Sequence, residues 1–245
     1  MERVLSWGRG LRKPAQQGSA PAPPPRRDPS IREPPDDISL LPNISDEAII
    51  GTIRDRFARE QIYTACFQLV IAVNPCTLVP ALYTRAVGTR CAMVATPGAS
   101  EPAPAHVWRV SGEAYADIRK GCERGALHSQ TIVITGDSGA GKTESARLIQ
   151  AHLLSMSALA PELSEAALAQ TLLQSTLLLE AFGNAMTTAS SPNSSRFGKF
   201  SVLVYDEKAQ ITGSYVETYL LETSRLVWRE EGQSNFHVLY MLCAA

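Results

Sequence analysis

The sequence predicts an α/β fold in which helices flank a mixed central β-sheet. Three observations support this prediction. The run from Thr131 to Thr135 is rich in β-branched residues and apolar on both faces, which is typical of a strand covered on both sides. A glycine-rich loop and a helix over 142–154 follow it directly. Further along, residues 199–205 and 210–220 alternate between polar and apolar side chains, as paired strands do.

The elements before this strand are predicted in the same way, from the helical and strand spacing of apolar residues. A helix begins at Ser45, which precedes two acidic residues, and its apolar side chains share one face: Ile49, Ile53 and Phe57. The run over 67–73 is apolar and β-rich, so it predicts a strand that the following Asn-Pro stops. A loop over 96–104 and a helix over 111–124 complete this half of the chain.

The elements after the glycine-rich loop include two more helices, over 163–182 and 235–245. Between them, the alternating segments predict a hairpin with its tight turn at 206–208. No internal repeat occurs in the sequence.

The N-terminal 35 residues differ from the rest in composition. They hold eight of the 16 prolines, and seven Lys or Arg residues against three Asp or Glu. Such a segment buries too little apolar surface to offset its ordering entropy, so we expect it to be disordered. As a Pro-rich arm it would act as a tether, as a ligand for an SH3-type partner or as a lipid-binding tail. The ordered domain is then expected over residues 36–245.

Composition excludes several classes of function. The net charge is −1, so the chain lacks the basic signature of a nucleic-acid-binding protein. No apolar run approaches the length of a transmembrane helix. The five cysteines are scattered without a C-x-x-C pair, which argues against a zinc site or a disulfide framework. These features indicate a cytoplasmic protein.

The glycine-rich loop, residues 136–143, reads G-x-x-x-x-G-K-T, which is a complete Walker A pattern. It lies between a predicted strand and a predicted helix, the context that this pattern requires. Glycines let backbone N–H groups surround a phosphate, and the helix that begins there directs its positive dipole end at the same anion. Lys142 would reach the β- and γ-phosphates, and the Thr143 hydroxyl would ligate Mg²⁺.

A phosphate-binding loop fits a small GTPase, a generic P-loop ATPase or kinase, and a cytoskeletal motor. A GTPase needs an Asn-Lys-x-Asp guanine reader, and the sequence contains none. A generic ATPase needs an apolar strand ending in an Mg²⁺-side carboxylate, for which Asp206 is the candidate. The alternating strand that follows it favours a hairpin-turn residue instead.

A second polar element, the serine–arginine segment (residues 193–200), reads NSSRFGKF and follows the loop by about 50 residues. Its serine hydroxyls suit Mg²⁺ coordination and the orientation of water beside a γ-phosphate. Arg196 would pair with a carboxylate elsewhere and so hold the segment closed.

These two elements together resemble the N-terminal part of a myosin motor head. GDSGAGKTE resembles the myosin phosphate loop, with Asp137 where the family usually has Glu, and NSSRFGKF resembles switch I. Further segments resemble the head in the same order: RFAREQIYT (56–64), VNP (73–75), LLLEAFGNAMT (177–187), YLLETSRLV (219–227) and FHVLYML (236–242). The resemblance spans residues 36–245 and implies a P-loop NTPase core in which Asp206 is a hairpin residue.

The resemblance also implies roles for individual residues. Ser194 would relay a proton from the lytic water, Ser195 would ligate Mg²⁺ with Thr143, and Arg196 would pair with a glutamate of switch II. The nucleotide-binding residues would be Gly136, Asp137, Ser138, Gly139, Ala140, Gly141, Lys142, Thr143 and Asn193; Ser194, Ser195, Arg196 and Lys142 would be catalytic. The four histidines are expected to be structural: His106, His128, His152 and His237.

Departures from the family pattern affect the nucleotide pocket. Ser191 stands where myosins usually carry an asparagine that touches nucleotide. Cys76 and Thr77 stand where the family usually has Tyr-Lys near the adenine, and Tyr83 is one position out of step with a residue near the base. These changes are expected to weaken purine binding.

The family's switch II motif, Asp-x-x-Gly-Phe-Glu, does not occur in the sequence, so we expect it beyond residue 245. The sheet would then lack strands, and Arg196 would lack its expected partner. The resemblance implies an ATP- and Mg²⁺-binding fragment of an actin-based motor, associated with the cytoskeleton as part of a myosin complex. The complete head would be an ATPase, whereas this chain alone is expected to be nearly inactive. The alternative is a non-catalytic remnant that acts as an interaction protein through its Pro-rich arm.

Overall fold

The computed structural model describes residues 2–8, 33–93, 103–126, 128–157, 165–188 and 191–244. Its strands are β1 (Glu2–Gly8), β2 (Tyr63–Cys66), β3 (Leu69–Val73), β4 (Thr131–Gly136), β5 (Asn184–Thr187), β6 (Ser191–Ser195), β7 (Gly198–Tyr205) and β8 (Ile211–Tyr219). Its α-helices are α1 (Asp46–Ala58), α2 (Arg85–Ala92), α3 (Val107–Glu123), α4 (Lys142–Met156), α5 (Glu165–Gly183) and α6 (His237–Ala244). Short 3₁₀ turns cover Ile38–Leu40, Pro80–Tyr83 and Thr223–Leu226.

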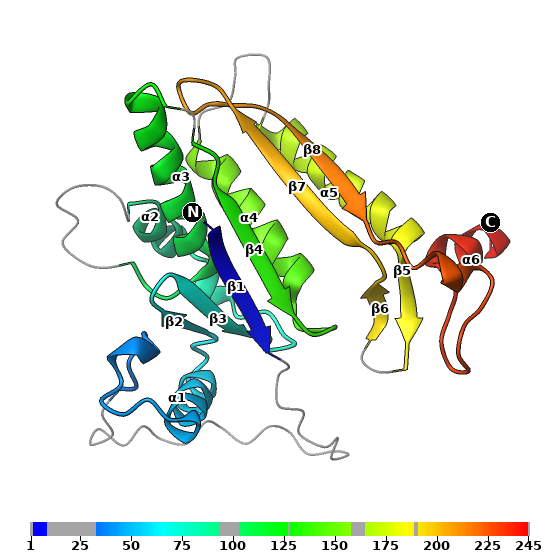
Figure 1. Cartoon of the computed structure of the whole chain (residues 1–245), viewed down its shortest axis with the longest axis horizontal. Coiled ribbons are helices and arrows are strands. Elements are labelled where there is room, and N and C mark those ends of the chain that lie inside the picture. Colours follow the sequence, from blue (N-terminus) through cyan, green and yellow to red (C-terminus); the bar gives the residue numbers. More distant parts are fainter. Residues whose placement is uncertain are drawn as a thin grey trace.

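The main sheet has the strand order β2-β3-β1-β4 (Figure 1). Strands β3 and β4 both run parallel to β1, whereas β2 pairs with β3 in the antiparallel sense. The sheet is therefore mixed, and together with the helices it confirms the predicted α/β class.

Within residues 1–35, where we expect a disordered arm, the structure describes residues 2–8 as strand β1. Its backbone pairs on both edges: Leu5 is opposite Val70 of β3 and also opposite Ile134 of β4. Pairing on two sides satisfies the backbone N–H and C=O groups of the strand, and the composition of a 35-residue window cannot reveal this. The prolines at positions 14–29 lie outside the described residues, and so does the predicted Pro-rich ligand.

The ordered domain begins slightly before the predicted Asp36. The buried guanidinium of Arg56 donates to the carbonyl oxygens of Pro34 and Pro35, at 3.4 and 3.1 Å. Its other nitrogens donate to the Thr64 hydroxyl and the Tyr63 carbonyl, at 3.1 and 2.9 Å. One arginine thus joins the start of the domain to α1 and β2.

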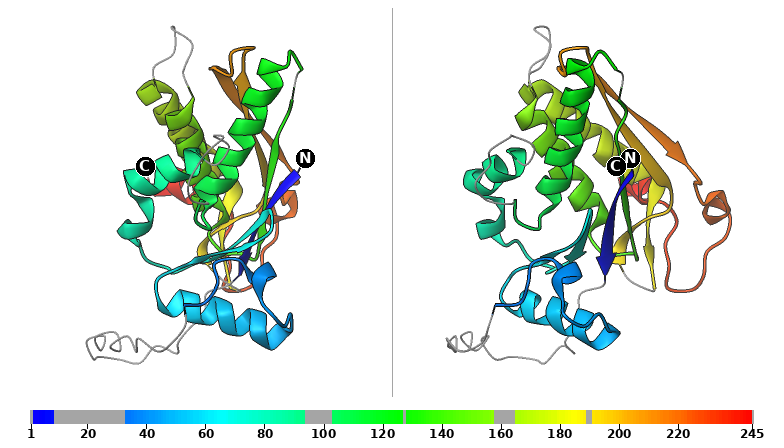
Figure 2. Two further views of the ribbon diagram at one scale, coloured as in Figure 1. Left: turned by 90° about the vertical axis from the view of Figure 1, so that its left-hand side faces the viewer. Right: turned by 60° about the vertical axis from the view of Figure 1, so that its left-hand side comes forward.

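Helices α3 and α4 pack on the main sheet and bury its core (Figure 2). The core contains apolar side chains from β3, from the start of α3 and from α4: Val70, Ala72, Val107, Val110 and Ile149. Helix α1 begins where the sequence predicts, because the Ser45 hydroxyl accepts a hydrogen bond from the Ala48 N–H. Among the described helices, none is both long and apolar enough to cross a bilayer.

Strands β7 and β8 form a separate antiparallel hairpin, as predicted. Its turn is closed by Asp206, whose carboxylate accepts hydrogen bonds from the Lys208 and Gln210 N–H groups at 2.9 and 2.7 Å. Asp206 is therefore a turn residue and not the end of a metal-binding strand. The hairpin packs through Ile211 on Leu154 of α4 and Leu172 of α5.

Candidate nucleotide site

The glycine-rich loop joins β4 to α4, so the sheet and the helix fix its two ends. Gly136, Gly139 and Gly141 have φ angles of 147°, 77° and 97°. A residue with a Cβ atom would be strained in this region, which explains glycine at all three positions. The left-handed Gly141 is also the N-cap of α4. The first N–H groups of this helix have no partners within it and point toward the loop.

Lys142 folds back over the loop from the first turn of α4. Its Nζ donates to the carbonyl oxygens of Gly136 and Asp137, both at 2.8 Å. Burial lowers the pKa of Lys142, and the charge of Asp137 partly opposes this shift. The hydroxyl-bearing Thr143 is exposed beside it. An ammonium, a hydroxyl and a helix N-terminus therefore share one small region, the donor set that a phosphate requires.

The serine–arginine segment reaches the glycine-rich loop directly. The hydroxyl oxygens of Ser138 and Ser194 lie 3.0 Å apart, although 56 positions separate them in the chain. Ser194 is buried on β6, whereas its neighbours Asn193 and Ser195 are exposed. The structure therefore brings the two predicted halves of the site together through these serines.

Asn193 is held from two sides through its side-chain oxygen. The Asn184 amide donates to it at 2.8 Å, and His237 Nε2 of α6 lies 3.1 Å from it. The sequence predicted no role for Asn184 and only a structural one for His237; both lie in segments that resemble the head, but those segments indicate no contact with Asn193. Both residues orient a predicted nucleotide contact.

Arg196 pairs with a carboxylate of this chain, Glu222, which is a different residue from the switch II glutamate that the resemblance implies. Its Nε lies 2.6 Å from an oxygen of Glu222, which follows β8. Its backbone is fixed as well, since its N–H donates to Gly183 and its carbonyl accepts from the Glu222 N–H, at 2.8 and 3.0 Å. Glu222 lies inside the quoted segment YLLETSRLV, but nothing in its local sequence indicates an arginine 26 positions earlier.

The segment after β3 lies against the other side of the loop. The Asn74 amide donates to the Gly139 carbonyl at 2.8 Å and its side-chain oxygen accepts from the Cys76 N–H at 2.9 Å. Tyr83 was compared above with a family residue near the adenine base. Its hydroxyl lies 2.9 Å from the Tyr63 hydroxyl. Asn74 therefore contacts the glycine-rich loop, a contact that the VNP match did not predict.

The chemistry of the donors also bears on a metal ion. Within the described ranges, no group of three or more His, Cys, Asp or Glu side chains could hold one. The candidate ligands Thr143 and Ser195 offer single hydroxyl oxygens, which suit Mg²⁺ because this ion takes few protein ligands and completes its shell with phosphate and water oxygens. A cavity of about 290 Å³ lies beside the loop, lined by Ser138, Thr187, Arg196, Glu222, Arg225, Trp228, Glu230 and Gln233.

Comparison with known proteins identifies the family of the chain. The family model described as myosin head (motor domain) matches residues 35–245. Protein OPAQUE1 of Zea mays is 37% identical over 210 residues, which are 86% of this chain and 13% of the relative. Unconventional myosin-Ia of Gallus gallus is 36% identical over 210 residues, 85% of this chain and 19% of the relative. Unconventional myosin-IXa of Mus musculus is 38% identical over 209 residues, which are 85% of this chain and 8% of the relative.

The chain thus spans less than one fifth of the length of each of these relatives. Within that span the family match starts close to Glu33, the first residue described after β1, and includes the loop, the serine–arginine segment and Glu222. The chain belongs to the myosin head (motor domain) family.

Proposed function

We propose that this chain is the ATP-binding part of an actin-based motor head. The observation that supports it most is the contact between Ser138 and Ser194, which joins the glycine-rich loop to the serine–arginine segment. A loop alone fits many nucleotide-binding proteins, whereas a loop with a hydroxyl-bearing segment closed on it fits a site that senses a γ-phosphate. Residues 36–245 would then form part of a P-loop NTPase motor domain.

Each group in the site has a proposed role in binding. The N–H groups of residues 136–143 surround the β-phosphate, and Lys142 exchanges its two carbonyl acceptors for phosphate oxygens. Thr143 and Ser195 supply hydroxyl ligands for Mg²⁺, which when bound neutralises charge on the β- and γ-phosphates. Asn193 shapes the pocket wall.

In the complete head, Ser194 would accept the proton of the lytic water through its hydroxyl while passing its own onward. Arg196 would hold the segment closed over the γ-phosphate. Hydrolysis, movement on actin and association with the cytoskeleton belong to this proposal for the whole protein, because this chain covers only a small part of its relatives.

The proposal predicts that Lys142→Ala weakens binding of a fluorescent ATP analogue with Mg²⁺ by about a hundredfold, because the charged contact of its half-buried ammonium with the phosphates is lost. Titration of the purified chain, followed by fluorescence, measures this. Lys120→Ala is the matched control, since Lys120 lies on the exposed side of α3 in a 3.4 Å pair with Asp117.

If the unsubstituted chain binds no nucleotide, and Lys142→Ala loses nothing further, the proposal is wrong. The chain would then be a remnant that acts through protein contacts. Robust actin-activated ATP turnover by this chain alone would contradict the expectation that it is nearly inactive without the rest of the head.

A further inference from the structure

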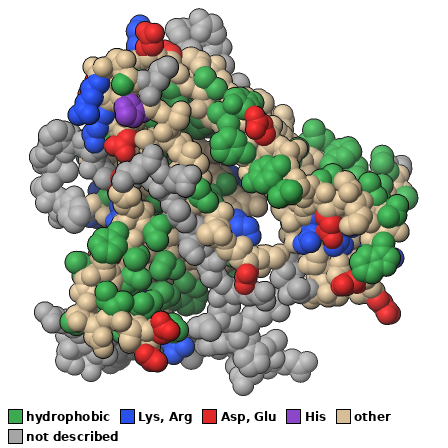
Figure 3. Space-filling model, in the orientation of Figure 1, with side chains coloured by type: hydrophobic (Ala, Val, Ile, Leu, Met, Phe, Trp, Pro, Cys, Tyr) green, Lys and Arg blue, Asp and Glu red, His purple; other side chains and the backbone are tan. Residues whose placement is uncertain are grey.

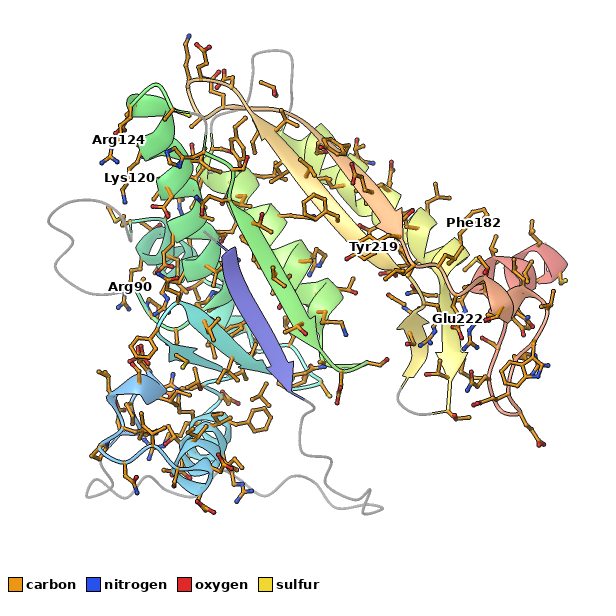
Figure 4. All side chains as sticks on the ribbon, viewed as in Figure 1. Arg90, Lys120, Arg124, Phe182, Tyr219 and Glu222 are labelled. Atoms are coloured by element: carbon orange, nitrogen blue, oxygen red, sulfur yellow. The ribbon has the colours of Figure 1, made fainter. Side chains whose placement is uncertain are left out.

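Glu222 lies at a junction between the candidate site and the last part of the chain (Figure 4). Its carboxylate contacts two arginines at once. Oε2 lies 2.6 Å from Arg196 Nε and 2.9 Å from Arg225 Nε, and Oε1 lies 3.2 Å from Arg225 Nη2. A carboxylate between two guanidinium groups stays ionised, and hydrogen bonds from Arg225 and then Arg196 lower the pKa of Glu222.

Arg225, which holds one side of the Glu222 carboxylate, is itself fixed in place by several hydrogen bonds. Its side chain is 5% exposed, and it donates to the Ser234 carbonyl and to the Gln233 side chain, both at 2.9 Å. The Asn235 amide donates to the Arg225 carbonyl at 2.6 Å. Because Arg225 is already immobilised, Glu222 loses little further side-chain entropy when it also binds Arg196, unlike a typical surface ion pair.

The other end of this network reaches the glycine-rich loop. Arg196 Nη1 lies 3.5 Å from the Ser194 hydroxyl, which lies 3.0 Å from the Ser138 hydroxyl. A continuous series of polar contacts therefore runs from Arg225 through Glu222, Arg196 and Ser194 to Ser138.

We propose that Glu222 is a positioning residue that holds Arg196 and thereby sets the Ser194 hydroxyl against the glycine-rich loop. The inference rests on the proposed nucleotide function of the same site and deepens it. In this role Glu222 does not touch the nucleotide. It holds the serine–arginine segment in the position where that segment would contact the γ-phosphate. Its loss should therefore affect a triphosphate more than a diphosphate.

The test compares Glu222→Gln with the unsubstituted chain, using fluorescent ATP and ADP analogues with Mg²⁺. The variant keeps the side-chain size and removes the charge. We expect ATP affinity to fall about tenfold, the effect of losing one charge-assisted hydrogen bond, and ADP affinity to change less than threefold. Glu217→Gln is the matched control, because Glu217 lies exposed on β8, five residues before Glu222.

A double-mutant cycle with Arg196→Gln separates positioning from a general structural effect. If Glu222 acts through Arg196, Glu222→Gln has little further effect in the Arg196→Gln background. Equal losses for ATP and ADP, or full additivity in the cycle, would overturn the inference. Thermal unfolding of each variant shows whether it is folded.

The two proposals fail in different ways. An unsubstituted chain that binds neither nucleotide refutes the proposed function and this inference with it. An unsubstituted chain that binds ATP while Glu222→Gln binds it equally well refutes only the role of Glu222.

Discussion

His106 shows at the scale of one residue how burial decides protonation. The side chain is 2% exposed, and burial, helped by the charge of His152, lowers its pKa to about 3. Its Nδ1 accepts the Trp108 N–H at 3.1 Å, which caps the start of α3, and its ring packs against the rings of Tyr63 and Tyr83 with centroids 4.5 and 5.6 Å away. The ring is therefore neutral near pH 7.

This burial predicts a pH-dependent stability. The pKa of His106 is about 3 in the folded chain and near 6.5 in the unfolded chain. Above pH 6.5 neither state binds the proton and the fold has its full stability. As the pH falls from 6.5 toward 3, only the unfolded chain takes up the proton, so stability is lost. The slope is at most about 1.4 kcal/mol per pH unit. His106→Asn keeps a capping oxygen and removes the titration, so chemical denaturation between pH 7 and 5 should show a flatter slope.

His128→Asn serves as the control for the substitution itself, because His128 is exposed. Burial also lowers the pKa of His152, so a smaller slope of the same sign should remain in His106→Asn. If the dependence of stability on pH is the same in His106→Asn as in the unsubstituted chain, His106 does not take up a proton on unfolding.

At the scale of elements, the contact between α2 and α3 depends on Gly112. A Cβ atom there would lie 2.0 Å from the carbonyl oxygen of Cys91, so the helices must separate to accept it. Gly112→Ala should lower the free energy of unfolding by about 1–3 kcal/mol. Gly51→Ala is the paired control: in α1 nothing lies within 4 Å of its added methyl group, and the change should stabilise by about 0.5–1 kcal/mol.

Urea denaturation of both variants measures these differences. Equal effects of the same sign would mean that helix propensity, and not the close approach of α2 and α3, governs position 112.

Helix boundaries show which elements local sequence can define. Ser45 with two acidic residues after it is a strong start signal, and α1 begins there. Helix α3 begins at Val107, four residues before the predicted start, because its cap is His106, a residue that is not typical of helix N-caps. Strand β2 was not predicted, since it is short and its pairing with β3 follows a turn in which Phe67 has a φ of 53°.

At the scale of the whole molecule, the strands differ in how many neighbouring strands they pair with. In the described chain β3 has paired strands on both edges, whereas β5 and β6 pair with each other as a two-stranded sheet. Large apolar side chains on α5 and α6 are exposed: Leu177, Leu178, Phe182, Tyr240, Met241 and Leu242. Figure 3 shows hydrophobic side chains gathered on the visible face of the half of the molecule that holds the β7–β8 hairpin and α6. Two-stranded sheets are marginally stable by themselves.

Hydrogen exchange should therefore be uneven. The amides of Val70 and Ala72, both fully buried in β3, should exchange much more slowly than those of β5 and β6, which open with less loss of packing. Mass-spectrometric exchange on the full chain measures this. Equal protection of both regions would show that the chain unfolds as one cooperative unit.

The sequence by itself determined the glycine-rich loop, its position between a strand and a helix, the hairpin turn at Asp206 and the myosin head family. These features depend on neighbouring residues, whose propensities and spacing are visible in a short window. Only the tertiary structure decided that β1 lies between β3 and β4, and that Arg196 meets Glu222, Asn193 meets His237 and Asn74 meets Gly139. The three side-chain contacts join residues 26 to 65 positions apart, and the pairing of β1 with β4 joins residues farther apart still; the path of the chain through the whole fold brings them together.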